Sequence, residues 1–281
     1  MNVSKQEIKN KAMKLQLSNG YYLRFEHLSR LLHYVVGKPG VSRFTQKELA
    51  LVLGMSPRMV ENLTSYGVAL GLLIQGSCKP TELGKLIDKQ DPFFDKSETL
   101  WFLHYIIASN RKYVVWNRLI NRVFPEESEV TTEVARKYFS DLNGCFSEKS
   151  LKKHLAKEIA VLFNTYTEQK FSYLKYINKL SKKVYQLNQS AQIPDLCILA
   201  SCYLYRDRYA KGATGLGIEH LVKEQNSPGR VFHISEDQLR LALERLHRKR
   251  CISIESRANL DQIRFRTNEH WLDVVKQFYE D

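Results

Sequence analysis

The sequence predicts a mostly α-helical protein in which two winged helix-turn-helix units flank an all-helical middle domain. Apolar residues recur at spacings of three and four over long segments, as in Leu28, Leu31 and Val35, and this is the period of an amphipathic helix. Alternating polarity is confined to two short runs, residues 71–81 and 251–266. Each run directly follows a helical pattern, which is the order of helices and β-hairpin in a winged helix.

The domain boundaries follow from these patterns. A chain of 281 residues is long enough for two or three units, and its aromatic and basic middle carries no strand signal. The predicted parts are an N-terminal arm (residues 1–22), a first winged helix (23–90), a helical middle domain (91–190) and a second winged helix (191–281).

Caps and breaks define the helices of the first winged helix. Thr45, Ser56 and Thr81 are N-cap residues, Pro57 suits a first helical position, and Gly54 suits a positive φ in a tight turn. The expected helices cover residues 24–36, 46–53, 57–71 and 82–87, with Val60, Leu63 and Leu70 buried. Two short strands are expected between the last two helices, one at Leu73-Ile74 and one just before Thr81.

The second winged helix is predicted in the same way. Ser235 caps a long helix that has acidic residues in its first turn and basic residues in its last, as the helix dipole favours. The expected elements are helices at 195–209, 218–225 and 236–250, a turn at 226–230, and strands at 251–255 and 262–266 around a loop at 256–261. In the last strand, Ile263 and Phe265 are expected to point inward and the alternating arginines outward.

The charge balance favours a polyanionic partner such as DNA. Lys and Arg number 43 against 30 Asp and Glu, a net charge of +13. The residues predicted to contact DNA are Arg58, Asn62, Ser65 and Lys79 in the first unit, and Arg240, Arg245, Arg248, Arg257, Arg264 and Arg266 in the second. The alternative is a solvated helix face, because the helix dipole alone favours cations at a C-terminus and Glu236, Asp237 and Glu244 lie on the same helix.

Other chemistry has weaker signals. The five cysteines are scattered without a C-x-x-C pair, which favours a reducing, cytoplasmic location over a disulfide framework or zinc site. No secretory leader or membrane-spanning run is present in the sequence, so no membrane partner is expected. Trp101 and His104 are interpreted as core residues rather than as a stacking platform or a general base. No catalytic or cofactor motif is evident, and the catalytic residues are unknown.

Several segments together resemble one bacterial family, called domain of unknown function 4007. The segments are "MSPRMVENLTSYGVALGLL", "PTELGKLI", "DPFFDKSETLWFLHYIIASN", "SEKSLKKHLAKEIAVLFNTY" and "NSPGRVFHISEDQL". The N-terminal part departs from the family pattern, because "LRFEHLSRL" stands where a Ser-Gly-His-Glu-Thr-Phe opening is usual. The family includes a protein of DNA phosphorothioation and anti-phage systems.

The resemblance implies a DNA-binding component of such a system. It implies a cysteine desulfurase, an ATPase and a protein similar to PAPS reductases as partners, and nicking of DNA, with Mg²⁺, as a candidate enzyme activity. We expect contacts to duplex phosphates through the winged helices, and sulfur transfer through the partners rather than through a cysteine of this chain. A winged-helix transcription regulator and a scaffold that docks sulfur-transfer enzymes remain the alternatives.

Overall fold

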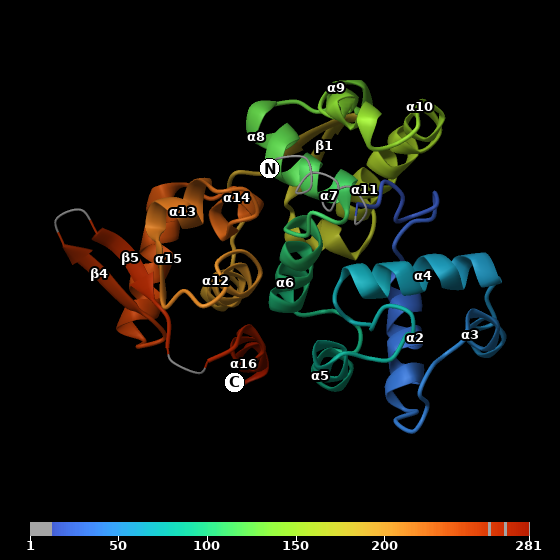
Figure 1. The fold of residues 1–281 in the computed structure, drawn as a ribbon, viewed down its shortest axis with the longest axis horizontal. Helices are drawn as coiled ribbons and strands as arrows, with labels where there is room; N and C mark the ends of the chain where they lie inside the picture. The colour runs from blue at the N-terminus through green and yellow to red at the C-terminus, as the bar shows by residue number, and fades with distance from the viewer. Residues whose placement is uncertain (1–12, 258–259, 267–268, 281) are drawn as a thin grey trace, which may run out of the picture. The chain divides into compact units, whose positions relative to one another are not determined.

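Helices dominate the computed structural model of the chain, which describes residues 13–257, 260–266 and 269–280. The chain divides into two units, one that ends at Asn188 and one that begins at Gln189 (Figure 1). The predicted first winged helix and middle domain both belong to the first unit. The mostly α-helical class predicted from the sequence is confirmed.

The first unit opens with helices α2 (Phe25–Val36), α3 (Gln46–Leu53), α4 (Pro57–Ala69) and α5 (Glu82–Gln90), of which the last three begin at the predicted caps. Thr45 Oγ1 accepts a hydrogen bond from the backbone N–H of Glu48, and Ser56 Oγ accepts one from Met59. Gly54 has the left-handed backbone (φ +64°) that the tight turn between α3 and α4 requires.

The two strands predicted between α4 and α5 are wrong. The structure has one isolated antiparallel bridge, between Leu73 and Pro80. The backbone N–H of Ile74 donates to the Lys79 carbonyl at 2.8 Å, and the N–H of Cys78 donates to the Ile74 carbonyl at 3.0 Å. These two bonds close a turn over residues 74–79, so the strands cannot extend in that direction. On the other side of the bridge the Thr81 N–H donates to the Leu72 carbonyl at 2.9 Å, and the pairing stops there because Thr81 is the N-cap of α5.

Helix α6 (Ser97–Ala108) is buried along most of its length. The helical elements that follow it are α7 (Val114–Arg118), η1 (Leu119–Val123), α8 (Phe124–Glu126), α9 (Thr132–Lys137), η2 (Ser140–Gly144), α10 (Glu148–Ser150), η3 (Leu151–Leu155), α11 (Ala156–Thr167) and η4 (Lys170–Leu174). Helix α6 contacts α7 and η4. His104 on α6 is hydrogen-bonded to Tyr166 and lies among aromatic rings. The prediction that Trp101 and His104 are core residues is confirmed, since they are 2% and 0% exposed.

The all-helical prediction for the middle of the chain is wrong at its C-terminal end. Strands β1 (Ile177–Ser181) and β2 (Val184–Leu187) form an antiparallel hairpin there. The sequence pattern misleads because lysines dominate this segment and resemble the polar face of a helix. Tertiary contacts favour the strand: Tyr185 exchanges two backbone hydrogen bonds with Val130 and stacks on Phe163 at 3.9 Å between ring centroids.

The second unit combines helices with a three-stranded antiparallel sheet in the order β3-β5-β4. Its elements are α12 (Asp195–Tyr209), β3 (Gly215–Gly217), α13 (Ile218–Lys223), α14 (Pro228–Phe232), α15 (Glu236–Arg248), β4 (Ser253–Arg257), β5 (Leu260–Arg264), α16 (Trp271–Lys276) and η5 (Gln277–Tyr279). Ile263 is fully buried, as predicted, and Phe265 is half-buried against Tyr203.

Several details of the second unit differ from the prediction. Both hairpin strands lie two residues nearer the turn, at Ser253–Arg257 and Leu260–Arg264 instead of 251–255 and 262–266. The turn expected at 226–230 is replaced by helix α14, because Ser227 caps it and Pro228 occupies its first turn. The loop expected at 256–261 is shorter, since Arg257 pairs with Leu260 across the hairpin. Strand β3 was not predicted because glycine has low strand propensity. Gly215 fits beside β5, where an added Cβ would lie 2.6 Å from the Ile263 carbonyl oxygen.

The N-terminal segment, residues 13–23, is anchored in the first unit by the carboxylate of Glu158 on α11. Both carboxylate oxygens accept the backbone N–H of Ser18 at 3.0 Å, and Oε1 also accepts the Ser18 hydroxyl at 2.7 Å. Glu158 is 2% exposed, and burial raises the pKa of its carboxyl against the opposing effect of the donors. The part of the predicted arm before residue 13 lies outside the described residues.

Replacing Glu158 by alanine is expected to destabilise the protein by about 3 kcal/mol, because a buried N–H and hydroxyl lose their acceptor. Urea unfolding followed by circular dichroism measures this loss. Glu148→Ala is the control, since Glu148 forms an exposed ion pair with Lys152 and its loss should leave the unfolding midpoint almost unchanged. Equal midpoints for the two variants would contradict the anchoring role of Glu158.

Candidate nucleic-acid interface

Helix α15 and the hairpin β4–β5 form one basic face of the second unit. Ser235 and Gln238 make a capping box at the start of α15, with hydrogen bonds of 3.2 and 2.8 Å in opposite directions. The apolar stripe of Leu239, Leu243 and Leu246 is buried, so the remaining side chains of the helix face away from the core. The sequence pattern therefore orients α15 correctly.

Three of the predicted arginines are bound to carboxylates of the same unit. Arg245 holds Asp195 of α12 through two hydrogen bonds of 2.8 and 2.7 Å. Arg240 pairs with Asp261 of β5. Arg264 pairs with Glu255 at 2.9 Å and donates to Thr214 at 2.8 Å.

These ion pairs join α15 to its neighbours and set the charge that the face presents. The Arg240 guanidinium and the Ser256 hydroxyl hold the pKa of Asp261 below its usual range. Each paired arginine has its charge balanced locally by a carboxylate. Arg240–Asp261 joins α15 to β5, Arg245–Asp195 joins α15 to α12, and Arg264–Glu255 joins the two strands of the hairpin, so these arginines contribute less to attracting a distant anion than unpaired ones would.

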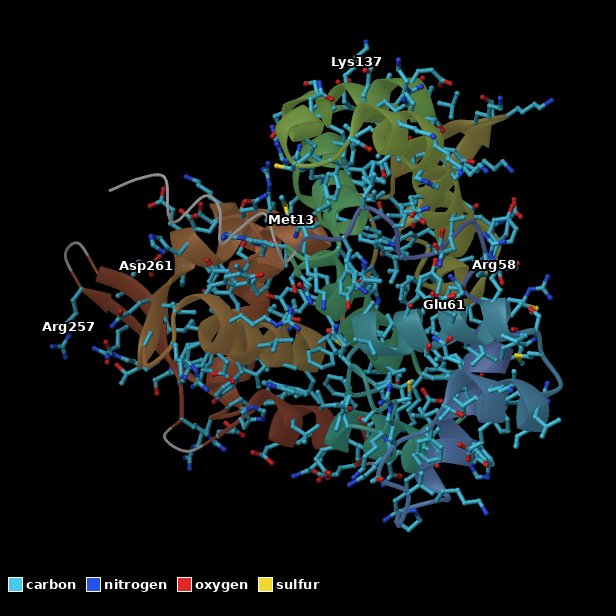
Figure 2. All side chains as sticks on the ribbon, turned by 45° about the vertical axis from the view of Figure 1, so that its right-hand side comes forward. Met13, Arg58, Glu61, Lys137, Arg257 and Asp261 are labelled. Carbon is cyan, nitrogen blue, oxygen red and sulfur yellow. The ribbon has the colours of Figure 1, made fainter. Side chains whose placement is uncertain are left out.

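The other three predicted arginines are exposed and form no ion pair with any described residue. Arg248 lies in the last turn of α15, Arg257 at the end of β4, and Arg266 just after β5. Figure 2 shows Arg257 projecting from the end of the hairpin. Lys249 and Arg250 follow Arg248 and are also exposed, so positive charge gathers at the C-terminal end of α15, whereas Arg257 lies at the tip of the hairpin.

The acidic residues of α15 do not cancel that charge. Glu236 and Asp237 occupy the first turn of the helix, whereas Arg248 is its last residue. At 1.5 Å per residue the two ends are about 18 Å apart, which exceeds the screening length of about 8 Å at physiological salt. The solvated-face alternative therefore applies to the start of α15 better than to its end.

The residues predicted as DNA contacts in the first unit do not lie together. Asn62, expected to face outward, is 3% exposed, and its amide donates to the carbonyls of Leu17 and Ser18. The prediction is wrong because the N-terminal segment covers this face of α4. Arg58 is exposed at the start of α4 (Figure 2), while Ser65 and Lys79 are half-buried elsewhere.

The structure instead shows a basic cleft that the sequence did not predict. It has a volume of about 420 Å³ and runs between the N-terminal segment, the start of α3, α4 and the turn after α4. Its described lining contains no carboxylate: Lys14, Arg43, Phe44, Thr45, Gln46, Thr64, Ser65, Val68, Gln75, Gly76, Cys78 and Tyr113. We call it the lysine cleft.

Two amines lie close together beside the lysine cleft. The backbone of Lys14 pairs with the segment after α6 through a bond from its N–H to the Lys112 carbonyl at 2.7 Å. Burial and the charge of Lys14 lower the pKa of the Lys112 ammonium, which donates to Gln75 at 2.6 Å. Two repelling cations among hydroxyl and amide groups are suited to an anion such as phosphate. No local pattern could have predicted this, because Lys14 and Lys112 are far apart in sequence.

Two of the five cysteines lie in surroundings that raise the pKa of the thiol. Cys197 and Cys202 are fully buried in α12, as predicted, and burial raises the pKa of the Cys202 thiol. Burial also raises the pKa of Cys78 beside the lysine cleft, against the effect of Arg43. A raised pKa disfavours the thiolate that nucleophilic sulfur chemistry uses.

The whole-chain comparison agrees with the resemblance found in the sequence. The pattern of the family described as "Protein of unknown function (DUF4007)" matches residues 19–279. The chain belongs to this family. No curated protein matches it.

Two solved structures are similar to this DUF4007 protein. One is described as "SspB crystal structure", with a TM-score of 0.81, and the other as "Magnesium ion-bound SspB crystal structure", with a TM-score of 0.79. Each is 17% identical, and each match covers 97% of this chain and 90% of the other. At this identity the likeness establishes a shared fold.

Neither a metal-binding cluster nor a membrane-spanning helix occurs in the described part of the DUF4007 chain. Residues 13–257, 260–266 and 269–280 contain no group of three His, Cys, Asp or Glu side chains placed to hold a metal ion. Over the same residues, none of the helices has the length and apolar character needed to cross a bilayer.

Arginines with a carboxylate partner and arginines without one are expected to contribute differently to stability. Arg245→Ala should lower the free energy of unfolding by about 0.5–1 kcal/mol, because Asp195 loses a two-point partner. Arg248→Ala should leave it nearly unchanged, since Arg248 has no carboxylate partner among the described residues. Urea titrations of both variants, with Asp195→Ala to complete a double-mutant cycle for Arg245, test this. If Arg248→Ala lowered the free energy of unfolding as much as Arg245→Ala, the distinction between paired and unpaired arginines would be refuted.

Proposed function

We propose that this protein binds duplex DNA through its backbone phosphates, as a component of a bacterial DNA phosphorothioation system. The observation that carries the proposal is a set of exposed arginines that form no ion pair with a described carboxylate: Arg248 and Arg266 beside the base of the β4–β5 hairpin, and Arg257 at its tip. Phosphate contacts from Lys and Arg supply most of the affinity of non-specific DNA binding. The net charge of +13 adds a long-range attraction for the same polyanion.

The element order supports a winged-helix interpretation of the second unit. Helix α12, strand β3, helix α13, helix α15 and the hairpin β4–β5 occur in the order of a winged helix, with the short helix α14 inserted between α13 and α15. In this interpretation α15 is the recognition helix and the hairpin is the wing. In the first unit, α2, α3 and α4 form the three helices, and the single bridge at Leu73 and Pro80 stands in place of a wing.

The place in a phosphorothioation system rests on the family. Membership of DUF4007 and the likeness to SspB favour this role over that of an unrelated regulator. We propose a cysteine desulfurase, an ATPase and a protein similar to PAPS reductases as partners that supply the sulfur. A transcription regulator would instead protect one specific operator in a footprint, and a pure scaffold would bind these enzymes without binding DNA.

Changing Arg248, Arg257 and Arg266 together to alanine should weaken duplex binding at all sequences. The slope of log affinity against log salt should become shallower by about 0.9 for each phosphate that the variant no longer neutralises. Fluorescence anisotropy of a labelled duplex over a series of salt concentrations measures both changes.

The control variant replaces Arg136, Lys137 and Lys182, which are exposed on the first unit and carry the same total charge. It should reduce the slope much less than the α15 and hairpin variant. Equal effects of the two variants would show that net charge, not this face, governs binding. Absence of duplex binding at low salt would reject the proposal.

Nicking of DNA is a second candidate activity, favoured by the magnesium ion described in one of the similar SspB structures. The test is incubation of supercoiled plasmid with the protein and Mg²⁺, with EDTA as the control. Open circles that form only with Mg²⁺ support nicking, and plasmid that stays supercoiled in both argues against it.

A further inference from the structure

A second hollow in the first unit lies between the N-terminal segment, α2 and the start of α4. Its volume is about 320 Å³, at the lower end of the range of small-ligand sites. Tyr21, Tyr22, Arg24, His27 and Met59 contribute to its wall, and we call it the tyrosine pocket. It shares none of its lining residues with the lysine cleft.

The wall of the pocket is held in place by the buried network around Ser18. The Ser18 carbonyl accepts the N–H of Tyr21 at 2.8 Å, and its hydroxyl oxygen accepts the N–H of Gly20 at 2.9 Å. Gly20 has a φ of +85°, which lets the chain turn sharply toward Tyr21 and Tyr22. Asn62, fixed by the same segment, also lines the pocket. The pocket is therefore preorganised rather than formed by a loose loop.

The lining combines flat rings, soft apolar groups and a few polar groups. Tyr22 is 48% exposed at the pocket, and the thioethers of Met55 and Met59 face the same space. Burial, together with Arg24 and Arg30, lowers the pKa of His27, so its imidazole is neutral at pH 7 and offers one donor and one acceptor. None of the described lining residues is acidic, which disfavours a cationic ligand.

We propose that the tyrosine pocket binds one unstacked nucleobase of a DNA strand. Aromatic rings, histidine and arginine are the surfaces on which proteins stack exposed bases, and an amide and a neutral imidazole can hydrogen-bond a base edge. Arg24 lines the pocket, is exposed and forms no ion pair with any described residue, which suits the phosphate attached to that base. The inference rests on the proposed binding of DNA and adds that one base leaves the helix stack.

The experiment compares duplexes that differ at a single position: fully paired, with one unpaired 2-aminopurine, and with an abasic residue at that point. The intact protein should bind the unpaired base about tenfold more tightly than the other two, since stacking of a base contributes about 1–3 kcal/mol by alanine substitution. Tyr22→Ala and Met59→Trp, which fills the pocket, should each abolish the preference. Tyr173→Ala is the matched control, because Tyr173 is 68% exposed and does not line the pocket.

Equal affinity of the intact protein for the three duplexes, or a preference that survives both pocket variants, would overturn the inference while leaving duplex binding in place. If the protein binds no duplex at all, the proposed function fails. Titration calorimetry with free dAMP then tests independently whether the tyrosine pocket binds a base. Binding of dAMP but not of deoxyribose 5-phosphate, lost in Tyr22→Ala, supports the pocket, and no binding of dAMP overturns it. Circular dichroism of each variant confirms folding, and Tyr22→Ala changes only a partly exposed ring.

Discussion

The arrangement of the first unit depends on one buried carboxylate. Glu158 of α11 accepts the backbone and hydroxyl hydrogens of Ser18, and this fixes a segment that has no regular secondary structure of its own. A buried charge is tolerated only when it is well hydrogen-bonded, so the segment and the carboxylate require each other. The same segment brings Lys14 to the lysine cleft and Tyr21 to the tyrosine pocket, which lie on different faces of α4. Both surfaces thus have one structural origin.

In the second unit, the charge that the surface presents depends on which arginines form ion pairs, not on how many arginines there are. Asp195, Asp261 and Glu255 each hold an arginine, and these pairs connect α15 to α12, α15 to β5, and β4 to β5. Exposed ion pairs of this kind contribute little stability individually, and their effect here is to orient the hairpin. The arginines left over lie at the base of the hairpin (Arg248 and Arg266) and at its tip (Arg257), where none of them forms an ion pair with a described carboxylate. A count of cations along the sequence cannot separate the two groups.

Local signals predicted much of the fold, and long-range contacts account for the errors. Helix α3 has the predicted bounds because Thr45 and Gly54 specify its two ends within the sequence. Asn62 was misplaced because the segment that covers it lies some forty residues earlier, as its bonds to Leu17 and Ser18 show. The hairpin β1–β2 depends on Tyr185 pairing with Val130, which no period along the chain encodes. The candidate site follows the same rule: exposed arginines of α15 were predictable, their partners were not.

The central claim is that the face formed by α15 and β4–β5 binds duplex DNA. Hydrogen–deuterium exchange of the full-length protein, with and without a DNA duplex at low salt, tests this claim most directly. Slower exchange is expected at the end of α15 and along β4 and β5, the surface proposed to contact DNA phosphates. Exchange in α9 and α11 should be unchanged, because neither helix belongs to this surface. Protection confined to α9–α11, or no protection anywhere at a saturating concentration of duplex, would contradict this claim.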